Sequence, residues 1–360
     1  MTKERAVAAP ESAPVSPAVA RPWAHPSVLA RWEFFLVLIL GLFVWMGTRV
    51  SPYFLTPSNF ANLTSAMMEV AIMALPATLI IIAGEIDLSV ESTLGLASAI
   101  LGFLWAAGVP LEVDIPLVLA VGGLAGLLNG LLVARAGLPS LVVTLGTLAL
   151  YRGLAQVVLG TRAISDFPSG FTAFGFGTVP GSPIPWTLIV FAMLGAVFWF
   201  VAHATWIGRQ VFAVGKNKDA ARYAAVDVAA LKTALFVVSG VLAALAGIIL
   251  TARFSSARGD NGSGLVLTVV TIVLLGGVDI NGGKGTIPGV ILAVFTLATL
   301  QSALNLAGVS GDYQTVAVGL LLIVSITAPY IARQARTVIG RVLRARHPPP
   351  DPVAHGEVVG

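Results

Sequence analysis

The chain has 360 residues, of which 57% are hydrophobic and 11% are charged, with a formal net charge of +4. Soluble domains carry about 25% charged residues, so this composition excludes a soluble protein and indicates an integral membrane protein. Uninterrupted apolar runs of roughly 20 residues are typical of membrane-spanning helices and not of outer-membrane strands. The absence of cysteine excludes disulfides, thiol chemistry and metal–thiolate sites.

Two proline-containing segments flank the apolar region, residues 32–332, which we expect to be a transmembrane domain. Residues 1–31 contain five prolines and predict a disordered cytoplasmic tail. This tail is not expected to be a cleavable signal peptide, because the apolar run begins too late and is too long. Residues 333–360 contain an arginine cluster followed by HPPPDP and predict a second cytoplasmic tail whose arginines suit anionic headgroups.

Between the tails, the apolar segments predict an all-α bundle of about ten transmembrane helices with both termini in the cytoplasm. The third and eighth segments are short for a full crossing, which predicts broken or re-entrant helices buried in the protein or lining a cavity. The ten segments are Glu33–Thr48, Ala66–Ala83, Thr93–Ala107, Ile115–Ala134, Ser140–Gly160, Trp186–Ala204, Ala234–Thr251, Leu265–Val278, Thr286–Ala307 and Tyr313–Ala332.

The distribution of cations supports this orientation. With both termini inside, most of the 21 Lys and Arg residues lie in the cytoplasm, and the outside keeps Arg49, Arg162, Arg253 and Arg258. This asymmetry follows the positive-inside rule. The basic surplus therefore orients the chain and requires no nucleic-acid partner.

One long polar loop, Thr205–Thr233, interrupts the apolar segments on the cytoplasmic side. Its middle, Asn217–Ala225, predicts a short helix with Asn217 as the N-cap and Asp219 in the first turn, where the macrodipole favours a negative charge. A charged helix between membrane spans could bind a soluble partner. A solvated loop that touches nothing is the alternative, and the residues alone leave both open.

Acidic residues cluster near the second and third predicted spans. Glu85, Asp87 and Glu91 follow Gly84, a residue that lets the backbone turn. They line either a water-filled break within the membrane or a short acidic turn, and a break is the more expected of the two. Glu69 lies early in the second span, where we expect it to reach the headgroups.

Several polar residues lie on otherwise apolar helices, and most are expected to hold helices together. Thr144 and Thr147 share a helix face, which suits either a polyol or packing. Arg152 requires a carboxylate or several carbonyls if it is buried. The full set is Asn129, Thr144, Thr147, Arg152, Gln156, Gln301 and Asn305.

The glycine-rich segment Gly276–Thr286 resembles a phosphate loop only superficially. The pattern requires Gly at position 278 and Ser or Thr at position 285, where the chain has Val278 and Gly285, and no strand is expected before it. We therefore expect no nucleotide site here, and predict a tight turn between two packed helices.

Four ordered motifs resemble the permease subunit of bacterial ABC importers for monosaccharides, of the ribose, xylose, rhamnose and autoinducer-2 type. The resemblance covers about residues 33–330 and implies three partners in the bacterial inner membrane system: a cytoplasmic ATPase that binds ATP and Mg, a periplasmic sugar-binding protein and a second permease subunit. It implies that this chain binds no cofactor and is not an enzyme. The motifs are GEIDLSV (84–90), PSLVVTLGTLALYRGLA (139–155), the segment 208–250 and LGGVDINGGKGTIPGV (275–290).

The resemblance also assigns residues. It implies that a coupling helix docks on the ATPase through Asn217, Lys218, Asp219, Ala220, Ala221, Arg222 and Tyr223. The family pattern has glycine at the positions of Glu85, Glu91 and Ala225. The segment GVSGDYQTVAVG (308–319) favours a rhamnose- or autoinducer-2-type member. Candidates for the translocation pathway or its scaffold are Glu85, Asp87, Ser89, Thr144, Thr147, Arg152, Asp279 and Asn281.

Two other function classes are compatible with parts of the sequence. A secondary transporter driven by an ion gradient would use buried carboxylates such as Glu69, Glu85 and Asp87, and would need no ATPase. A membrane-embedded enzyme would need a cluster of nucleophile, base or metal ligands, and neither the four histidines nor any other group clusters in this way. The residues do not define the sugar, or whether the two permease chains are identical.

Overall fold

The computed structural model describes residues 26–327, with side chains from Trp32 onward, and these residues form a helical bundle without a β-strand. The predicted all-α fold is therefore confirmed. Residues 1–25 and 328–360 lie outside the described residues, together with most of both predicted tails and the end of the tenth predicted span. The first helix begins at Pro26, so it includes residues 26–31, which we predicted to belong to the N-terminal tail.

Each of the ten predicted apolar segments coincides with a helix. In the described part of the chain, seven helices are long and apolar enough to cross a membrane, and three apolar helices are shorter. The seven are α1 (Pro26–Val50), α2 (Pro57–Ile82), α4 (Leu111–Ala134), α5 (Ser140–Leu159), α7 (Trp186–Ala204), α10 (Val228–Phe254) and α12 (Ile287–Leu306). The three are α3 (Val90–Ala106), α11 (Leu265–Leu275) and the unlabelled Gly311–Thr327.

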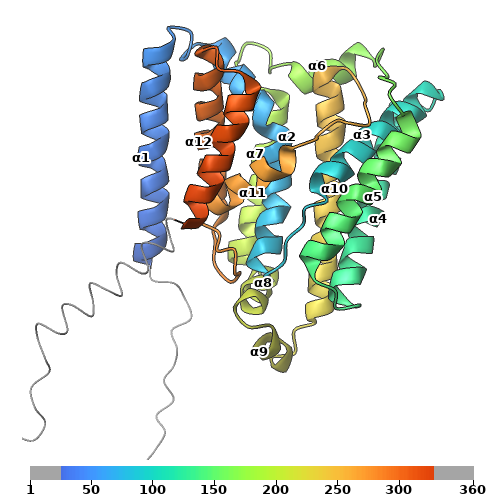
Figure 1. Ribbon diagram of the computed structural model, residues 1–360, viewed down its shortest axis with the longest axis vertical. Coiled ribbons are helices and arrows are strands. Elements are labelled where there is room, and N and C mark those ends of the chain that lie inside the picture. The colour runs from blue at the N-terminus through green and yellow to red at the C-terminus, as the bar shows by residue number, and fades with distance from the viewer. Residues whose placement is uncertain (1–25, 328–360) are drawn as a thin grey trace, which may run out of the picture.

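Helix α2 lies at the centre of the bundle and α1 lies at its edge (Figure 1). Nearly every residue of α2 after Thr64 is buried, whereas α1 exposes large apolar side chains such as Phe34, Leu38 and Trp45. Exposed apolar faces of this kind suit lipid contact. Trp32 holds α1 to its neighbours, because its indole N–H donates to the Leu275 carbonyl at 2.9 Å.

Glycines bring α4 and α10 into backbone contact. A Cβ atom at Gly126 would collide with the Phe236 carbonyl oxygen, and one at Gly240 would collide with the Gly122 carbonyl oxygen. Small residues at such crossings allow the close approach that membrane helices need for packing. The close packing predicted from these glycines is confirmed for this pair of helices.

The two predicted short segments are short helices. Helix α11 has 11 residues and is about 16 Å long, which does not cross about 30 Å of hydrocarbon. Helix α3 has 17 residues. Non-helical segments, residues 83–89 and 255–264, lead into these two helices. Residues 83–89 lie mostly within the bundle, where neighbouring side chains can bond to their backbone, whereas residues 255–264 are partly exposed.

Substituting a valine at Gly126 is expected to destabilise the bundle by about 1–3 kcal/mol, because the side chain cannot fit against α10 without moving its backbone. Gly146→Val on α5 is the matched control, since a Cβ atom there meets open space. The melting temperature of each variant, purified in detergent, is measured by thermal unfolding followed by size-exclusion chromatography. Equal losses of melting temperature in the two variants would contradict the tight α4–α10 contact.

Candidate functional site

A short helix, α9 (Lys218–Tyr223), projects from one end of the bundle beyond α8 (Trp206–Lys216), as Figure 1 shows. Asn217 caps α9, because its side-chain oxygen accepts hydrogen bonds from the backbone N–H of Asp219 at 3.0 Å and of Ala220 at 2.9 Å. The predicted helix and its N-cap are confirmed. The first turn also carries Asp219, as expected for a favourable macrodipole interaction.

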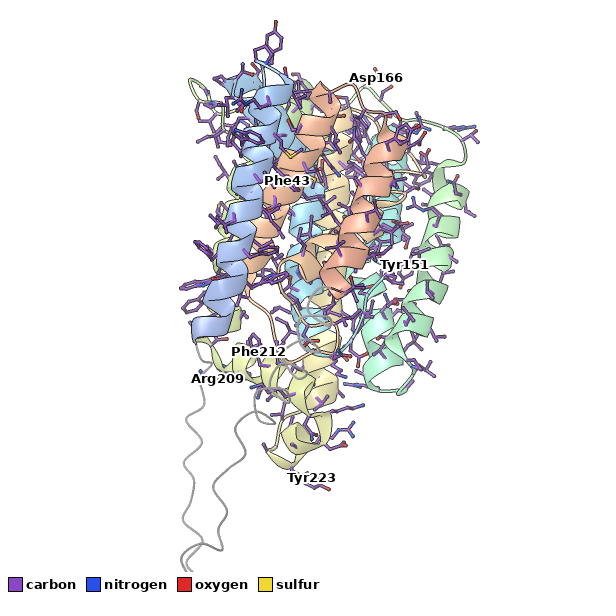
Figure 2. The ribbon with its side chains drawn as sticks, turned by 60° about the vertical axis from the view of Figure 1, so that its left-hand side comes forward. Phe43, Tyr151, Asp166, Arg209, Phe212 and Tyr223 are labelled. Atoms are coloured by element: carbon purple, nitrogen blue, oxygen red, sulfur yellow. The ribbon has the colours of Figure 1, made fainter. Side chains whose placement is uncertain are left out.

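Helix α9 presents a basic and aromatic outer face. Tyr223 is 93% exposed and points away from the bundle in Figure 2, and Lys218 and Arg222 are also exposed. Ala221 is the inward residue, and it packs with Val214 of α8 and Val228 of α10 in a small apolar cluster. This cluster fixes the position of α9, while its outer side chains remain available to another molecule.

The turn after α9 keeps the geometry for which the family pattern uses glycine. Ala225 has a φ of 60°, in the left-handed region. The N–H of Val226 donates to the Ala221 carbonyl at 3.1 Å, which closes the helix in a Schellman-like arrangement. An alanine in this conformation costs about 1–2 kcal/mol, so the neighbouring contacts must offset that strain.

At the same end, α8 meets the end of α2 and the glycine-rich segment Gly276–Thr286. A Cβ atom at Gly215 would collide with the Ile82 carbonyl, and that carbonyl accepts from the Gly283 N–H at 2.8 Å. The segment forms a tight turn, in which the backbone N–H and the side-chain amide of Asn281 both donate to Asp279 Oδ1 at 3.1 Å. Asp279 and Asn281 therefore shape this turn.

The acidic segment between α2 and α3 lies along α10. Glu85 forms an ion pair with Lys232, and Asp87 Oδ2 accepts from the Ser239 hydroxyl at 2.8 Å. Lys232 and Ser239 are seven residues apart, so they occupy the same face of α10 two turns from each other. Lys232 was predicted to lie in the cytoplasmic loop, and this is wrong: α10 begins at Val228, and Lys232 is only 5% exposed.

The remaining bonds of Asp87 and Ser89 tie the segment to α4. Asp87 Oδ1 accepts from the backbone N–H of Ser89 at 3.0 Å and from its hydroxyl at 2.7 Å. Ser89 Oγ in turn accepts from the Asn129 amide of α4 at 2.8 Å, which confirms that Asn129 joins helices. Each carboxylate oxygen of Asp87 thus has at least one donor within the protein.

Helix α5 holds the same segment through its first turns. The Ile86 N–H donates to the Ser140 hydroxyl at 3.1 Å. The Thr144 hydroxyl donates to the Ser140 carbonyl at 2.8 Å, and the Thr147 hydroxyl donates to the Val143 carbonyl at 3.1 Å. Both threonines are buried. Of the two interpretations of this pair, packing is favoured over contact with a polyol.

Arg152 joins the two short helices at their N-terminal ends. Its NH1 donates to the carbonyls of Gly259 at 3.0 Å and Asn261 at 2.9 Å, and its NH2 lies 3.8 Å from Glu91 Oε1. Glu91 Oε2 accepts from the Val266 N–H of α11 at 3.0 Å. Arg152 therefore has both the carboxylate and the carbonyls that we expected a buried guanidinium to need.

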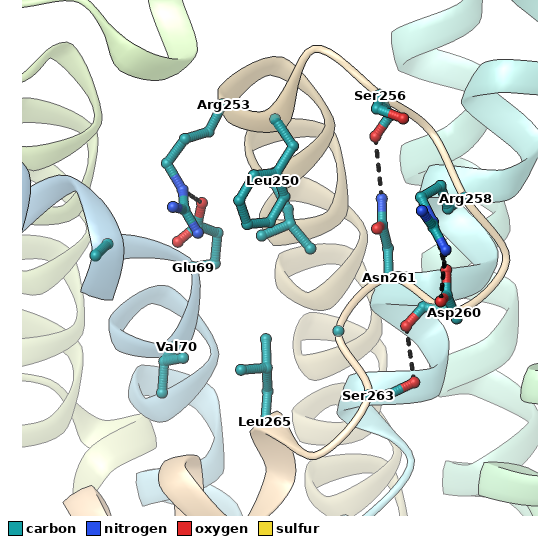
Figure 3. Close-up of a pocket in the computed structure, with 13 residues that line it drawn as sticks. Glu69, Val70, Leu250, Arg253, Ser256, Arg258, Asp260, Asn261, Ser263 and Leu265 are labelled. Atoms are coloured by element: carbon teal, nitrogen blue, oxygen red, sulfur yellow. Dashed lines mark hydrogen bonds and ion pairs between the residues drawn. The ribbon is translucent and has the colours of Figure 1, made fainter. Parts of the chain in front are cut away.

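At the end of the bundle opposite to α9, a pocket of about 500 Å³ lies between α2, the end of α10 and the start of α11 (Figure 3). Glu69 and Arg253 form an ion pair in its wall, with Arg253 Nε donating to Glu69 Oε1 at 2.7 Å. The prediction that Glu69 reaches the headgroups is wrong. Its side chain is 1% exposed, because it faces α10 from the central helix.

Residues 255–264 form the polar rim of this pocket. Arg258 donates to both carboxylate oxygens of Asp260, at 2.9 and 3.0 Å, and these hydrogen bonds lower the pKa of Asp260. The Asn261 amide donates to the Ser98 hydroxyl at 2.8 Å and to the Ser256 carbonyl at 3.2 Å. These bonds hold the rim in place against α3.

The sequence did not single out Lys232, Ser239 or Arg253 as site residues. Their partners lie 147, 152 and 184 residues away in the chain. For Lys232 and Arg253, the signal in the sequence was an ionisable residue next to an apolar run. We interpreted both residues as lying in loops.

Comparison with known proteins identifies the family. A sequence profile described as branched-chain amino acid transport system / permease component matches residues 59–326. The chain belongs to this permease family. Its relatives include three named autoinducer 2 import system permease protein LsrD. The relative in Enterobacter sp. (strain 638) is 38% identical over 81% of this chain and 91% of its own length.

The other two relatives give the same assignment. One from Yersinia enterocolitica is 36% identical over 88% of this chain and 97% of its own length. One from Photorhabdus temperata is 35% identical over 88% of this chain and 96% of its own length. No solved structure matches the chain. The predicted ABC-type permease is thus confirmed: the protein is a multi-pass inner-membrane transport subunit and not an enzyme.

The Glu85–Lys232 pair yields a prediction about the stability of the permease. Glu85→Gln or Lys232→Met alone is expected to cost about 3–5 kcal/mol, because each leaves a buried charge without its partner. The double variant is expected to be closer to wild type than either single variant. Melting temperatures of the four proteins in detergent measure this coupling. Additive losses would show that the two side chains do not depend on each other.

Proposed function

We propose that this permease imports autoinducer-2, or a sugar-like solute of similar chemistry, as the membrane-spanning subunit of an ATP-driven importer. The relatives named for autoinducer-2 import support this substrate class, since this chain covers more than nine tenths of their length. The segment 308–319, which favoured a rhamnose- or autoinducer-2-type member, supports the same choice.

In this proposal the end of the bundle that carries α9 faces the cytoplasm, and all ten apolar helices lie within the membrane. Both termini are then cytoplasmic. The support is the positive-inside rule, because the end of α4, the helix α8 and the start of α12 lie at the same end of the bundle as α9 (Figure 1), and the cations at these places are Arg135, Arg209 and Lys284. Helix α11 has only 11 residues, so it lies within the bundle but is too short to cross the membrane by itself.

Helix α9 is the proposed docking element for the ATPase, which binds ATP and Mg²⁺. The observation that carries this role is the combination of an exposed outer face, with Arg222 and Tyr223, and a buried anchor at Ala221. Aromatic and arginine side chains dominate the binding energy of many protein interfaces. The ATPase can bias the permease between conformations only if it binds them with different affinity.

The proposed complex also includes a periplasmic binding protein and a second permease subunit. The binding protein delivers the solute to the end of the bundle opposite to α9. Exposed apolar faces of α1, α4 and α5 are available to lipid and to the second subunit. The proposed scaffold residues are Glu85, Asp87, Ser89, Thr144, Thr147, Arg152, Asp279 and Asn281. The first four and Arg152 bond to other segments, Thr147 donates to a carbonyl of its own helix, and Asp279 and Asn281 bond to each other.

An ion-gradient-driven transporter is the rival function. It would need carboxylates that can bind and release an ion during transport. Glu69, Glu85 and Asp87 are each engaged by a cation or by hydroxyl donors of the protein. The family relationship also favours an importer that works with an ATPase.

Reversing the charge at Arg222 tests the docking role. Arg222→Glu is expected to reduce co-purification of the ATPase at least tenfold, because the exposed cation becomes an anion at the centre of the proposed interface. Arg135→Glu is the control, since Arg135 is exposed at the same end but lies on the loop after α4. Pull-down from membranes in which both variants are inserted equally measures the effect.

Two results would overturn the proposal. One is equal retention of the ATPase by Arg222→Glu and Arg135→Glu. The other is uptake by the permease alone, reconstituted in vesicles with an ion gradient and no ATPase, which would establish the rival function.

A further inference from the structure

The pocket in Figure 3 has the size and position of a small-molecule site. Its volume of about 500 Å³ lies within the roughly 300–1,000 Å³ typical of such sites. It lies at the end opposite to α9, where the proposed function brings the solute. Three separate elements form it, so its shape depends on how α2, α10 and α11 sit relative to one another.

The ion pair in the pocket wall retains hydrogen-bonding capacity. A guanidinium has five N–H donors. Arg253 uses Nε for Glu69, and its other N–H groups donate to no other side chain or carbonyl among the described residues. A buried ion pair is favourable only when further hydrogen bonds satisfy its remaining groups. The pair therefore offers the remaining donors of Arg253, which is 20% exposed, at a position held by the buried Glu69 carboxylate.

The rest of the lining matches an uncharged hydroxylated molecule. The two acids and the two arginines of the pocket cancel in formal charge. Hydroxyl and amide residues of the segment 255–264 and apolar residues of the helices line the pocket together, a combination that suits a ring with polar edges and apolar faces, although the Asn261 amide and the Ser263 hydroxyl already donate within the protein. The polar members are Ser256, Asn261 and Ser263, and the apolar members include Val70, Leu250, Phe254 and Leu265.

We propose that this pocket binds a neutral polyhydroxylated solute as it enters the permease, with Arg253 donating to its hydroxyl groups and the buried Glu69 holding Arg253 in position. The proposal rests on the proposed import function and adds to it the residues that receive the solute. A site built to hydrogen-bond hydroxyls discriminates strongly against molecules that lack them. Glu69 and Arg253 would then determine which solutes pass.

The absence of cysteine from the chain provides a direct test. Ser263→Cys places a single thiol at an exposed position of the pocket rim, and Ser310→Cys places one at an exposed position of the same end, outside the pocket. Membranes containing the assembled importer are treated with a membrane-impermeant methanethiosulfonate reagent, with and without millimolar autoinducer-2 or ribose. We expect the solute to slow modification at position 263 at least threefold and to leave position 310 unchanged.

A second variant links the protection to the ion pair. Adding Glu69→Gln to Ser263→Cys is expected to raise the solute concentration for half-protection about tenfold, because Arg253 loses the carboxylate that orients its donors. If Glu69→Gln prevents membrane insertion, the Ser263→Cys protein alone still decides whether the solute occupies the pocket. Ribose 5-phosphate should protect much less than ribose, since the pocket has no surplus positive charge.

Failure of this proposal can be distinguished from failure of the import function. Uptake of the solute by the Ser263→Cys importer, with equal modification rates in the presence and absence of solute, overturns the pocket and leaves the import function intact. Absence of uptake together with absence of ATPase binding overturns the import function itself. Protection of position 310 to the same extent as position 263 would show a non-specific effect and would also overturn the pocket.

Discussion

The fold depends on how the hydrogen-bonding groups of residues 83–89, the non-helical segment before α3, find partners inside an apolar bundle. Unpaired backbone groups cannot remain there, since no bulk water is present to bond to them. Residues 83–89 are held by hydroxyl, amide and charged side chains from α4, α5 and α10, including the Glu85–Lys232 ion pair. Because three helices supply the partners, the segment also fixes how those helices sit together.

The same contacts connect the proposed docking helix to the interior. Only four residues separate α9 from α10, and Lys232 lies in the second turn of α10. Further along α10, on a different side of the helix, the Thr251 hydroxyl bonds with Ser98 of α3 at 2.7 Å. Helix α10 therefore links the short connection after α9 to residues 83–89 and to α3 through directly bonded side chains.

Hydropathy and capping patterns predicted the helices well, because each depends on residues close together in the chain. The ten apolar segments and the Asn217 cap are examples, and Gly84 adopts the positive φ expected of its turn. The wrong interpretations of Glu69 and Lys232 concern which helix a side chain faces. That depends on contacts between distant segments, such as Arg253 with Glu69, which no local pattern encodes.

The Glu85–Lys232 pair also constrains how this sequence can diverge from the glycine-containing family pattern. A chain with glycine at position 85 and lysine at position 232 would bury a cation without a partner, and the reverse combination would bury a lone carboxylate. Either chain is expected to be less stable than one that keeps the pair. Substitutions at positions 85 and 232 are therefore expected to occur together, or to pass through an uncharged polar residue at one of the two positions.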